Sequence, residues 1–334
     1  MKETGTQVPH GLLLEELQRD FPLVSRPFRR IGRRCGLAEE RTLETTRELL
    51  SQGMIREISA LLDARRIGVR TALVAVRAGD RAEELGQRIS RHPGVSHNYL
   101  REHDWNLWFT LAVPAERNLG AEVRATFEGE EVPTMVLPAL RTFKLQVRLR
   151  FTDPGIGIPE QEAPAGGRDD GPVMTVRLEP FEKRLLALLE EPLPLVPRPW
   201  ALLASGLQVS QRRLLAAVGR LKRRGVVRRI AAVLRHRSAG FQANAMVCFQ
   251  VPEERILEAG RRAAQLPQVS HCYQRETAPQ WPYSLYAMLH ARNRQECDGL
   301  VRELAGRVGG EDYQVLYSLR ELKKRRIKHF GEKQ

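Results

Sequence analysis

The sequence predicts an α+β protein that is a tandem duplication. Each half is predicted to be a winged helix-turn-helix unit followed by a ferredoxin-like β-α-β-β-α-β domain. Two observations predict this fold: segments of the first half recur in the same order in the second half, and each half passes from helical patterns to alternating strand and helix patterns. The 334 residues suffice for two to four domains, because single cores rarely grow past about 250–300 residues.

Four pairs of matching segments reveal the duplication, and each pair keeps its place in the order of the chain. The pairs are PLVSRPF at 22–28 and PLVPRPW at 194–200, GMIREI at 53–58 and GVVRRI at 225–230, VSHNYLR at 95–101 and VSHCYQR at 269–275, and VLPALRTFK at 136–144 and VLYSLRELK at 315–323. Four matches in one order are not expected by chance, so the two halves are diverged copies of one unit.

The first part of each copy is predicted to be a winged helix-turn-helix. In the first copy, a leucine-rich helix beginning near Leu12 ends at Phe21-Pro22, a second helix covers 27–34 with proline in its first turn, and a third covers 39–51. A glycine then ends the third helix, and the β-rich stretch 54–62 follows as the wing. The second copy repeats this pattern over 179–234.

The second part of each copy is predicted to be ferredoxin-like, because strand and helix patterns follow one another in the order β-α-β-β-α-β. The second copy shows the same order from residue 242 to about residue 319. In the first copy the predicted strands are 71–76, 94–101, 105–113 and one within 133–147, and the predicted helices are 81–91 and 116–128.

A linker is predicted at 152–173, which is rich in glycine, proline and acidic residues and lacks apolar periodicity. Its Gly-x-Gly follows no strand pattern and precedes no helix pattern, so we assign it no phosphate-binding role. The predicted domains are 10–65 and 174–237 for the winged units, and 66–151 and 238–330 for the ferredoxin-like domains.

The net charge of +14 predicts an anionic partner, which can be a nucleic acid, an acidic lipid or a polycarboxylate ligand. No apolar run approaches the roughly 20 residues that span a bilayer, and the N-terminus lacks the apolar core of a signal peptide, so we expect a cytoplasmic protein with no membrane contact. The four cysteines form neither a CxxC nor a cysteine–histidine zinc spacing, and we expect free thiols and no metal site.

Two aromatic-rich segments carry a family resemblance: HNYLREHDWNLWFTL at 97–111 and HCYQRETAPQWPYSLYAMLH at 271–290. The winged helix followed by a ferredoxin-like domain resembles the Lrp/AsnC transcription regulators. The two segments are more similar to the siroheme decarboxylases, the first to one subunit type and the second to its partner. The resemblance covers nearly the whole chain except the linker and the termini. One departure is Ser284, where the second pattern usually has asparagine.

The resemblance implies a carboxy-lyase of haem d1 synthesis or of the siroheme-dependent route to haem. The implied substrate is siroheme and the implied product is 12,18-didecarboxysiroheme, formed with loss of two CO2. Beyond the iron tetrapyrrole substrate the resemblance implies no cofactor. Other proteins of haem d1 or haem synthesis and a second copy of this chain are left open as partners. Whether the two copies contribute equally is also left open.

Loss of CO2 from an acetate leaves electron density on the former CH2 carbon, and a proton donor must complete the new methyl group. His97 and His271 are the predicted donors, because imidazole exchanges protons near neutral pH. Strand alternation places each histidine on one face with the tyrosine and arginine that follow it. Arginine pairs with carboxylates through two hydrogen bonds. The predicted partners on these faces are Tyr99 and Arg101 in the first copy, and Tyr273 and Arg275 in the second.

Further substrate contacts are predicted from the wing, the last strand and the aromatic segments. Single residues of these types more often have a structural role than a substrate-binding one. The alternative interpretation of the two histidine faces is that each is the polar face of an edge strand exposed to water. The additional candidates are Arg56, Arg228, Lys144, Lys323, Trp105, Trp281 and His290.

The rival prediction is a DNA-binding regulator, since a helix-turn-helix in a basic chain is the usual footprint of one. The expected recognition helix of the first copy carries four glutamates over 39–48, which would repel phosphates, whereas the second copy offers basic residues at 211–213 and 222–224. A mismatched pair reads palindromic DNA poorly, so we expect no nucleic-acid partner. A haem-binding sensor without catalysis is the remaining alternative, and turnover separates it from an enzyme.

Overall fold

The two winged units are built from short helices whose ends are set by proline and glycine. A computed structural model describes residues 8–145, 150–152, 155–157, 174–234, 243–310 and 312–330. Proline occupies the first turn of α2, α6 and α7, where its missing N–H costs nothing. Gly53 and Gly225 follow α3 and α8 with φ of 72°, a conformation that glycine adopts without strain. The helices are α1 (Val8–Gln18), α2 (Pro27–Arg34), α3 (Glu39–Ser51), α6 (Pro180–Glu190), α7 (Pro199–Gly206) and α8 (Gln211–Arg223).

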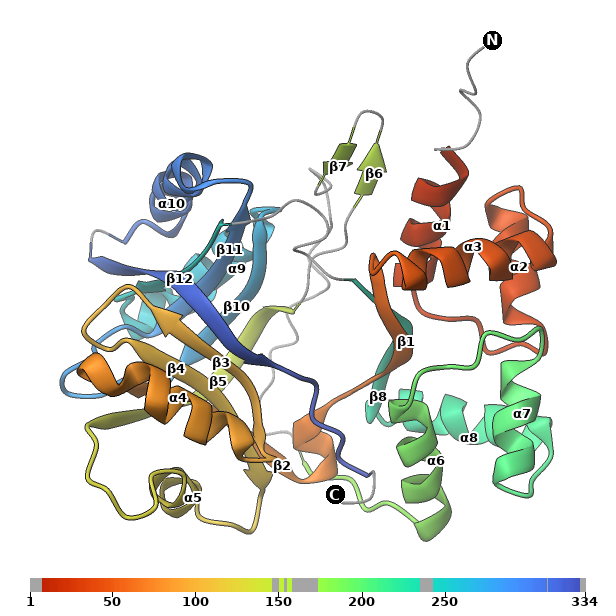
Figure 1. Cartoon of the computed structure of the whole chain (residues 1–334), viewed down its shortest axis with the longest axis horizontal. Helices are drawn as coiled ribbons and strands as arrows, with labels where there is room; N and C mark the ends of the chain where they lie inside the picture. Colours follow the sequence, from red (N-terminus) through yellow and green to blue (C-terminus); the bar gives the residue numbers. More distant parts are fainter. Residues whose placement is uncertain are drawn as a thin grey trace.

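The wings of the two copies pair with each other. Strand β1 (Ile55–Leu62) is antiparallel to β8 (Val227–Leu234), with Ser59 opposite Ala231. The two winged units therefore share one apolar core, in which Phe21 packs edge-on against Trp200, and the Trp200 indole donates a hydrogen bond to the Pro22 carbonyl. In Figure 1 the winged units lie on the right, and the β1–β8 ribbon is on the side that faces the rest of the molecule.

Each ferredoxin-like domain is a four-stranded sheet with two helices on one face. The 3-10 turns η1 (Ala64–Ile67), η2 (Gly79–Arg81) and η4 (Glu253–Arg255) lie before or beside the first helix of a domain. The first domain contains β2 (Val69–Val76), α4 (Ala82–Arg91), β3 (Val95–Arg101), β4 (Leu107–Pro114), α5 (Leu119–Ala125) and β5 (Thr134–Leu145). The second contains β9 (Ala243–Phe249), α9 (Ile256–Gln265), β10 (Val269–Arg275), β11 (Leu285–Ala291), α10 (Arg294–Val308) and β12 (Tyr313–Lys324).

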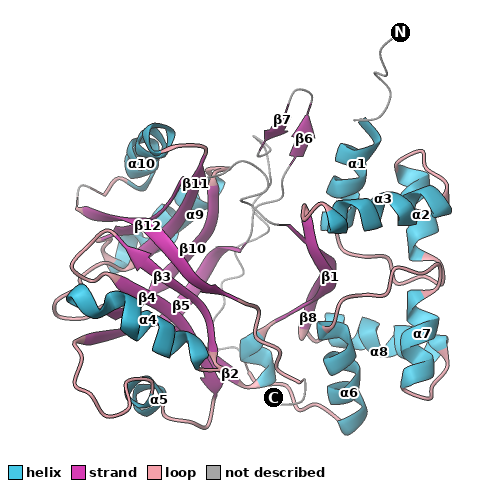
Figure 2. Cartoon of the chain, in the orientation of Figure 1, coloured by secondary structure: helices cyan, strands magenta, loops and turns pink. Residues whose placement is uncertain are grey.

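The two sheets join edge to edge into a closed barrel of strand order β10-β11-β9-β12-β3-β4-β2-β5. The long last strand of each copy makes both joins: β5 pairs with β2 of its own copy and β10 of the other, and β12 pairs with β9 and β3. Closure leaves no unpaired sheet edge, which removes the tendency of open edges to pair with other chains. Figure 2 shows the strands of the barrel gathered on one side and the helices of the winged units on the other.

The barrel strands are buried on both faces. Helices cover the outer face of each sheet over an apolar cluster of aliphatic and phenylalanine side chains. The inner faces meet in a third cluster, rich in aromatic residues, that includes Trp105, Trp108, Trp281 and Tyr286. Burial on two sides explains why β4 reads as a nearly continuous apolar run, Leu-Trp-Phe-Thr-Leu-Ala-Val.

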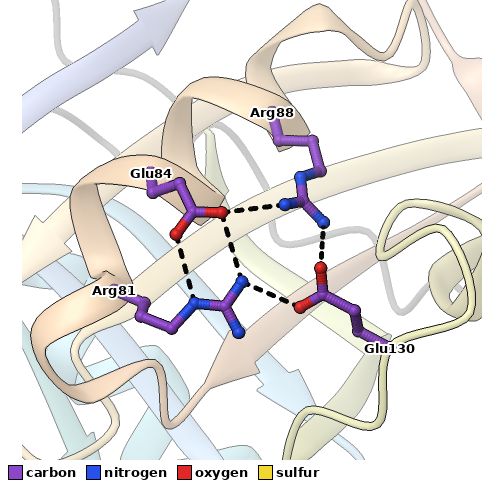
Figure 3. Close-up of polar contacts among 4 residues, drawn as sticks. All are labelled: Arg81, Glu84, Arg88 and Glu130. Atoms are coloured by element: carbon purple, nitrogen blue, oxygen red, sulfur yellow. Dashed lines mark hydrogen bonds and ion pairs between the residues drawn. The ribbon is translucent and has the colours of Figure 1, made fainter.

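A ring of ion pairs on the outer surface ties α4 to the turn after α5. Arg81 and Arg88 each bind both Glu84 and Glu130, with N–O distances of 2.7–3.1 Å (Figure 3). The hydrogen bonds from Arg88 and Arg81 lower the pKa of Glu130 below its ordinary value. All four groups reach solvent, so this network contributes less to stability than buried packing does.

The C-terminal segment after β12 connects the barrel to the winged units. The backbone N–H of Arg325 donates to the Ser96 carbonyl at 2.7 Å, and those of His329 and Phe330 donate to the Glu190 carboxylate at 2.9–3.0 Å. Arg326 donates to Ser59 and to the Ala60 carbonyl on β1. The segment therefore holds the β1–β8 ribbon beside strand β3.

The predicted fold class is confirmed: each copy is a winged helix-turn-helix followed by a ferredoxin-like domain. The stretch predicted as an irregular linker begins with a small antiparallel pair, β6 (Arg150–Thr152) and β7 (Gly155–Gly157), in which the apolar Phe151 and Ile156 are cross-strand partners. The rest of that prediction, 153–154 and 158–173, lies outside the described residues. Within the described part of the chain, no helix is both long enough and apolar enough to cross a membrane.

Candidate functional site

A β-bulge precedes the histidine in each copy. The pairing of β3 with β4 passes from Val95 opposite Leu111 to His97 opposite Thr110, so Ser96 is an extra residue. The pairing of β10 with β11 skips Ser270 in the same way. A bulge turns the next side chain toward a new direction and is often found beside active sites. In both copies the serine hydroxyl lies 2.9 Å from Nδ1 of the following histidine.

The residues after each bulge share one face of their strand. The rings of His97 and Tyr99 stack with centroids 6.4 Å apart, and the Arg101 guanidinium lies over the Tyr99 ring at 5.4 Å. The second copy repeats this arrangement, with centroids of His271 and Tyr273 6.2 Å apart and Arg275 over Tyr273 at 4.8 Å. Each copy thus places an imidazole, a phenol and a guanidinium in one row, which we call the histidine face.

The alternative that these faces belong to exposed edge strands is wrong. Strand β3 lies between β4 and β12, and β10 lies between β11 and β5 (Figure 1). Neither strand is an edge strand, because each pairs with one strand of its own copy and one strand of the other copy.

Arg101 is buried at the inner end of the first histidine face, with 4% of its surface exposed. It donates to the Leu316 carbonyl at 2.9 Å and to the Ser318 hydroxyl at 3.0 Å, while its buried Nε has no hydrogen-bond partner. Burial lowers its pKa to about 10, so it stays charged at neutral pH. No carboxylate of the described residues contacts it, although a buried charge normally needs a partner.

Arg275 holds the matching position in the second copy. It donates to the Leu137 carbonyl at 3.0 Å, lies over the Tyr286 ring at 5.6 Å, and its Nε has no hydrogen-bond partner. Burial lowers its pKa, and no described carboxylate contacts it either. Arg101 is buried, and Arg275 is half-buried with a buried Nε. Two such guanidinium groups without counter-ions among the described residues are suited to the carboxylates of an anionic ligand.

The surroundings of His97 disfavour its charged form. Burial is the largest cause, and the charges of Lys324 and Arg56 add to it, so that the pKa falls to about 4. Lys324 is the direct cross-strand partner of His97 on β12. In these surroundings His97 is therefore neutral near pH 7, and an anionic ligand beside it would raise its pKa.

His271 has different neighbours. The Ser270 hydroxyl lies 2.9 Å from Nδ1 of His271 and also 2.9 Å from Nε2 of His290, which comes from β11. The pairing of β3 with β4 places Ala112 at the position that matches His290. The direct cross-strand partner of His271 is Leu145 rather than a lysine.

The wing arginines act on the histidine faces from the β1–β8 ribbon. Arg56 lowers the pKa of His97 by its charge. Arg228 likewise acts against the rise that burial causes in the pKa of Tyr273, but it also forms an ion pair with Asp63 at 2.9 Å. The charges of Arg228 and Arg65 counteract burial and leave the pKa of Asp63 below its ordinary value.

Lys144 and Lys323 lie on the other face of the sheets. Lys144 Nζ donates to the Leu266 carbonyl at 2.9 Å, just after α9, and Lys323 Nζ donates to the Ser90 and His92 carbonyls, where α4 ends. Their cross-strand partners Cys272 and Asn98 also contact the covering helices. Both lysines complete helix C-termini, where a cation is favourable, and neither joins a histidine face.

The predicted aromatic residues are part of the barrel core. Trp105 and Trp281 are 5% and 2% exposed, and the Trp281 indole donates to the Tyr286 hydroxyl at 2.9 Å. His103 packs edge-on against Trp281, and its Nδ1 accepts the backbone N–H of Trp105. The hydroxyl of Ser284 donates to the Val251 carbonyl at 2.8 Å and accepts the Val251 N–H, so it fastens the start of β11.

The sequence did not indicate a role for Lys324, Ser270 or Glu321. The carboxylate of Glu321 accepts a hydrogen bond from the Tyr99 hydroxyl at 3.4 Å. The shared Val-Ser-His signal contains both serines, but the register that places Lys324 opposite His97 is visible only in the folded barrel. Among the described residues, no group of three or more histidine, cysteine, aspartate or glutamate side chains is placed to hold a metal ion.

Two family models match the chain, and each matches it twice. A model described as an AsnC-like ligand binding domain matches residues 66–144 and 238–323. A model described as a siroheme decarboxylase NirDL-like HTH domain matches residues 12–56 and 182–228. Both models therefore recognise the duplication.

Curated relatives match over most of the chain. The siroheme decarboxylase of Hydrogenobacter thermophilus is 40% identical, covering 96% of this chain and 94% of that protein. The siroheme decarboxylase NirDL subunit of Paracoccus pantotrophus is 32% identical, covering 94% of each. The NirH subunit of Pseudomonas aeruginosa is 43% identical over 42% of this chain and 85% of its own length, so this relative corresponds to one copy.

Two solved structures share the whole architecture. The crystal structure of the siroheme decarboxylase NirDL has a TM-score of 0.76 at 36% identity, covering 97% of this chain and 95% of that one. The crystal structure of NirDL in complex with an iron-uroporphyrin III analogue has a TM-score of 0.74 at 37% identity, with the same coverage.

Proposed function

Because this chain belongs to the siroheme decarboxylase family, in the fused form with both halves in one polypeptide, we propose that it removes two acetate carboxyl groups of siroheme as CO2. The product is 12,18-didecarboxysiroheme, and the reaction class is that of a carboxy-lyase. The observation that carries the proposal is the pair of matching histidine faces, each ending in an arginine whose Nε is buried and which contacts no carboxylate of the described residues.

Each decarboxylation breaks the bond between the acetate CH2 and its carboxylate. The electron pair of that bond stays on the CH2 carbon and spreads into the conjugated macrocycle, while the carboxylate leaves as CO2. A proton then joins the carbon and completes a methyl group. The protein has to hold the carboxylates, exclude water and deliver one proton for each CO2.

Arg101 and Arg275 are the proposed carboxylate-binding residues. Both guanidinium groups are held in place by backbone carbonyls and tyrosine rings, so little ordering is needed when a carboxylate arrives. Tyr99 and Tyr273 form the middle of each face, and Arg56 and Arg228 add positive charge from the ribbon. A substrate with several carboxylates matches this distribution of charge.

His97 and His271 are the proposed proton donors. Each has a serine hydroxyl 2.9 Å from Nδ1, and we assign the proton exchange with the substrate to Nε2. Among the protein's own groups His97 is neutral near pH 7, because burial and two cations lower its pKa to about 4. The bound carboxylates of the substrate offset those cations, so we expect substrate binding to charge this imidazole.

The macrocycle itself accepts the electron density, so the proposed reaction calls on no cofactor besides the iron tetrapyrrole that is its substrate. A cytoplasmic location remains a prediction. A second copy of the chain and other proteins of haem d1 or haem synthesis remain predicted partners. Gel filtration with light scattering tests the second copy directly. One peak at twice the chain mass would support it.

Anaerobic incubation of the purified chain with siroheme, followed by mass spectrometry of the tetrapyrrole, tests the proposed function. We expect a product lighter by two CO2, preceded by one lighter by a single CO2. Binding without loss of mass would mean a tetrapyrrole sensor and would overturn the proposal. If the chain neither binds siroheme nor changes its mass, DNA binding by the winged units becomes the alternative to test.

A further inference from the structure

The second copy contains a hydrogen-bonded chain that the first copy lacks. Ser270 Oγ lies 2.9 Å from Nδ1 of His271, 2.9 Å from Nε2 of His290 and 3.3 Å from the Met288 carbonyl. Ser270 has no exposed surface. In the first copy, the hydrogen-bond contact of Ser96 Oγ among the described residues is with His97, and Ala112 replaces the second histidine.

Counting protons limits how this chain can be arranged. A serine hydroxyl has one proton and can donate it once, and a carbonyl only accepts. Whichever of its three neighbours Ser270 donates to, at least one of the two imidazoles must donate an N–H back to the hydroxyl oxygen. When Ser270 donates to His290 or to Met288, the nitrogen that carries the proton on His271 is Nδ1.

We propose that His290 acts through Ser270 to hold His271 in the form protonated at Nδ1, so that Nε2 of His271 is the nitrogen that meets the substrate. This inference rests on the proposed function and makes His290 a positioning residue. The first copy has no such chain, because Ala112 stands in place of a second histidine. Ser96 can then either donate to Nδ1 of His97 or accept from it. The two histidine faces are therefore inequivalent although their backbones match.

The proposed arrangement fits the chemistry of proton donation. His271 gives up the proton on Nε2 as an imidazolium, and the remaining neutral ring keeps its proton on Nδ1. That ring donates to Ser270, and Ser270 donates to His290. The chain therefore holds the Nδ1 proton both before and after the transfer, so that the proton given up is the one on Nε2.

Nitrogen NMR of the protein with ¹⁵N-labelled histidine tests the proposal without any turnover. At alkaline pH, where imidazoles are neutral, His271 is expected to show a protonated Nδ1 and an unprotonated Nε2. Ser270→Ala and His290→Ala are expected to remove that preference and give averaged signals. His290→Gln should restore much of it, because its amide can still accept from Ser270. Ser96→Ala is the matched control and should change the signals of His97 only.

Turnover of siroheme supplies the second readout. Ser270→Ala and His290→Ala are each expected to lower the rate by about 10-fold to 100-fold, the range for a hydrogen bond to a charged group. The double variant should be no slower than Ser270→Ala alone, since His290 acts through the serine. An unprotonated Nδ1 in the wild type, unchanged His271 signals in His290→Ala, or multiplying rate effects would each overturn the proposal. If the NMR result holds and no variant or wild type turns over, the proposed function fails instead.

Discussion

The two histidine faces have nearly the same geometry and different surroundings. The histidine and tyrosine rings have centroids 6.4 Å apart in the first copy and 6.2 Å apart in the second, with interplanar angles of 21° and 22°. His97 is nevertheless paired across the ladder with Lys324 and lies near Arg56, whereas His271 is paired with Leu145 and reaches a second histidine through Ser270. Duplication has kept the backbone bulge that aims the imidazole and has let the residues that control its proton diverge.

Part of the difference arises from how the barrel closes. One neighbour of each histidine strand is the far end of the other copy's last strand, so His97 is paired with β12 and His271 with β5. The last strands can diverge without changing the histidine strands themselves. A matching motif in the two copies therefore does not give matching acid–base chemistry.

The largest expected effect comes from the arginines that end the two histidine faces. Arg101→Met and Arg275→Met should each weaken substrate capture by about 2–4 kcal/mol, or about 30-fold to 1,000-fold, because a buried charge pair with the substrate is lost. Stability should change much less, since each variant also removes a buried Nε that has no hydrogen-bond partner. Tetrapyrrole titration and thermal unfolding measure both. Equal binding by variant and wild type would place the carboxylates elsewhere.

A smaller effect is expected from the residue opposite His97. Lys324→Met removes a positive charge, so the pKa of His97 should rise from about 4, while remaining below 6.5 because burial is the larger cause. The His97 signals in an NMR titration measure this shift. A pKa of His97 that does not move would mean that Lys324 does not distinguish the two faces.

Acid should destabilise the protein in the window between pH 6.5 and about pH 4. His97 and His329 both have a folded pKa of about 4, lowered first by burial, against 6.5 when unfolded. The unfolded chain therefore binds more protons in this window, and the free energy of unfolding falls as the pH decreases. Denaturant unfolding at several pH values measures the slope. His97→Gln should flatten part of it, and an unchanged slope would contradict the assigned surroundings of His97.

The smallest effect is expected at the ion-pair ring of Figure 3, whose four residues form their ion pairs with one another. Glu130→Gln should lower the melting temperature only slightly, and more at low salt than at high salt, because exposed ion pairs are screened. Thermal unfolding at two salt concentrations measures this. Turnover is expected to stay at the wild-type rate. A large loss of activity would mean that the outer surface of the first copy influences its histidine face.

Much of the fold was predictable because local signals agree with the final structure. The helices at 27–34 and 39–51 were predicted at the bounds that α2 and α3 have, since proline and glycine mark their ends. The grouping of histidine, tyrosine and arginine followed from strand alternation. The joining of the two sheets into one barrel was not predicted, because it depends on pairing between strands such as β3 and β12 that lie more than 200 residues apart.

The site was predicted less completely than the fold. The positions of Lys144 and Lys323 on the helix-covered face depend on bulges in β5 and β12, which the sequence does not mark. The contact of His290 with Ser270 depends on a ladder between β10 and β11. Sequence spacing identified which residue types matter, and the register decided which of them meet.

The most direct test of this account follows siroheme by time-resolved mass spectrometry under anaerobic conditions with wild type, His97→Ala and His271→Ala side by side. The wild type is expected to lose one CO2 and then a second. Each variant should slow at least one of the two losses by about 100-fold or more, the usual contribution of a general acid. The two variants should differ in which loss they slow or by how much. Full rates in both variants would contradict the account.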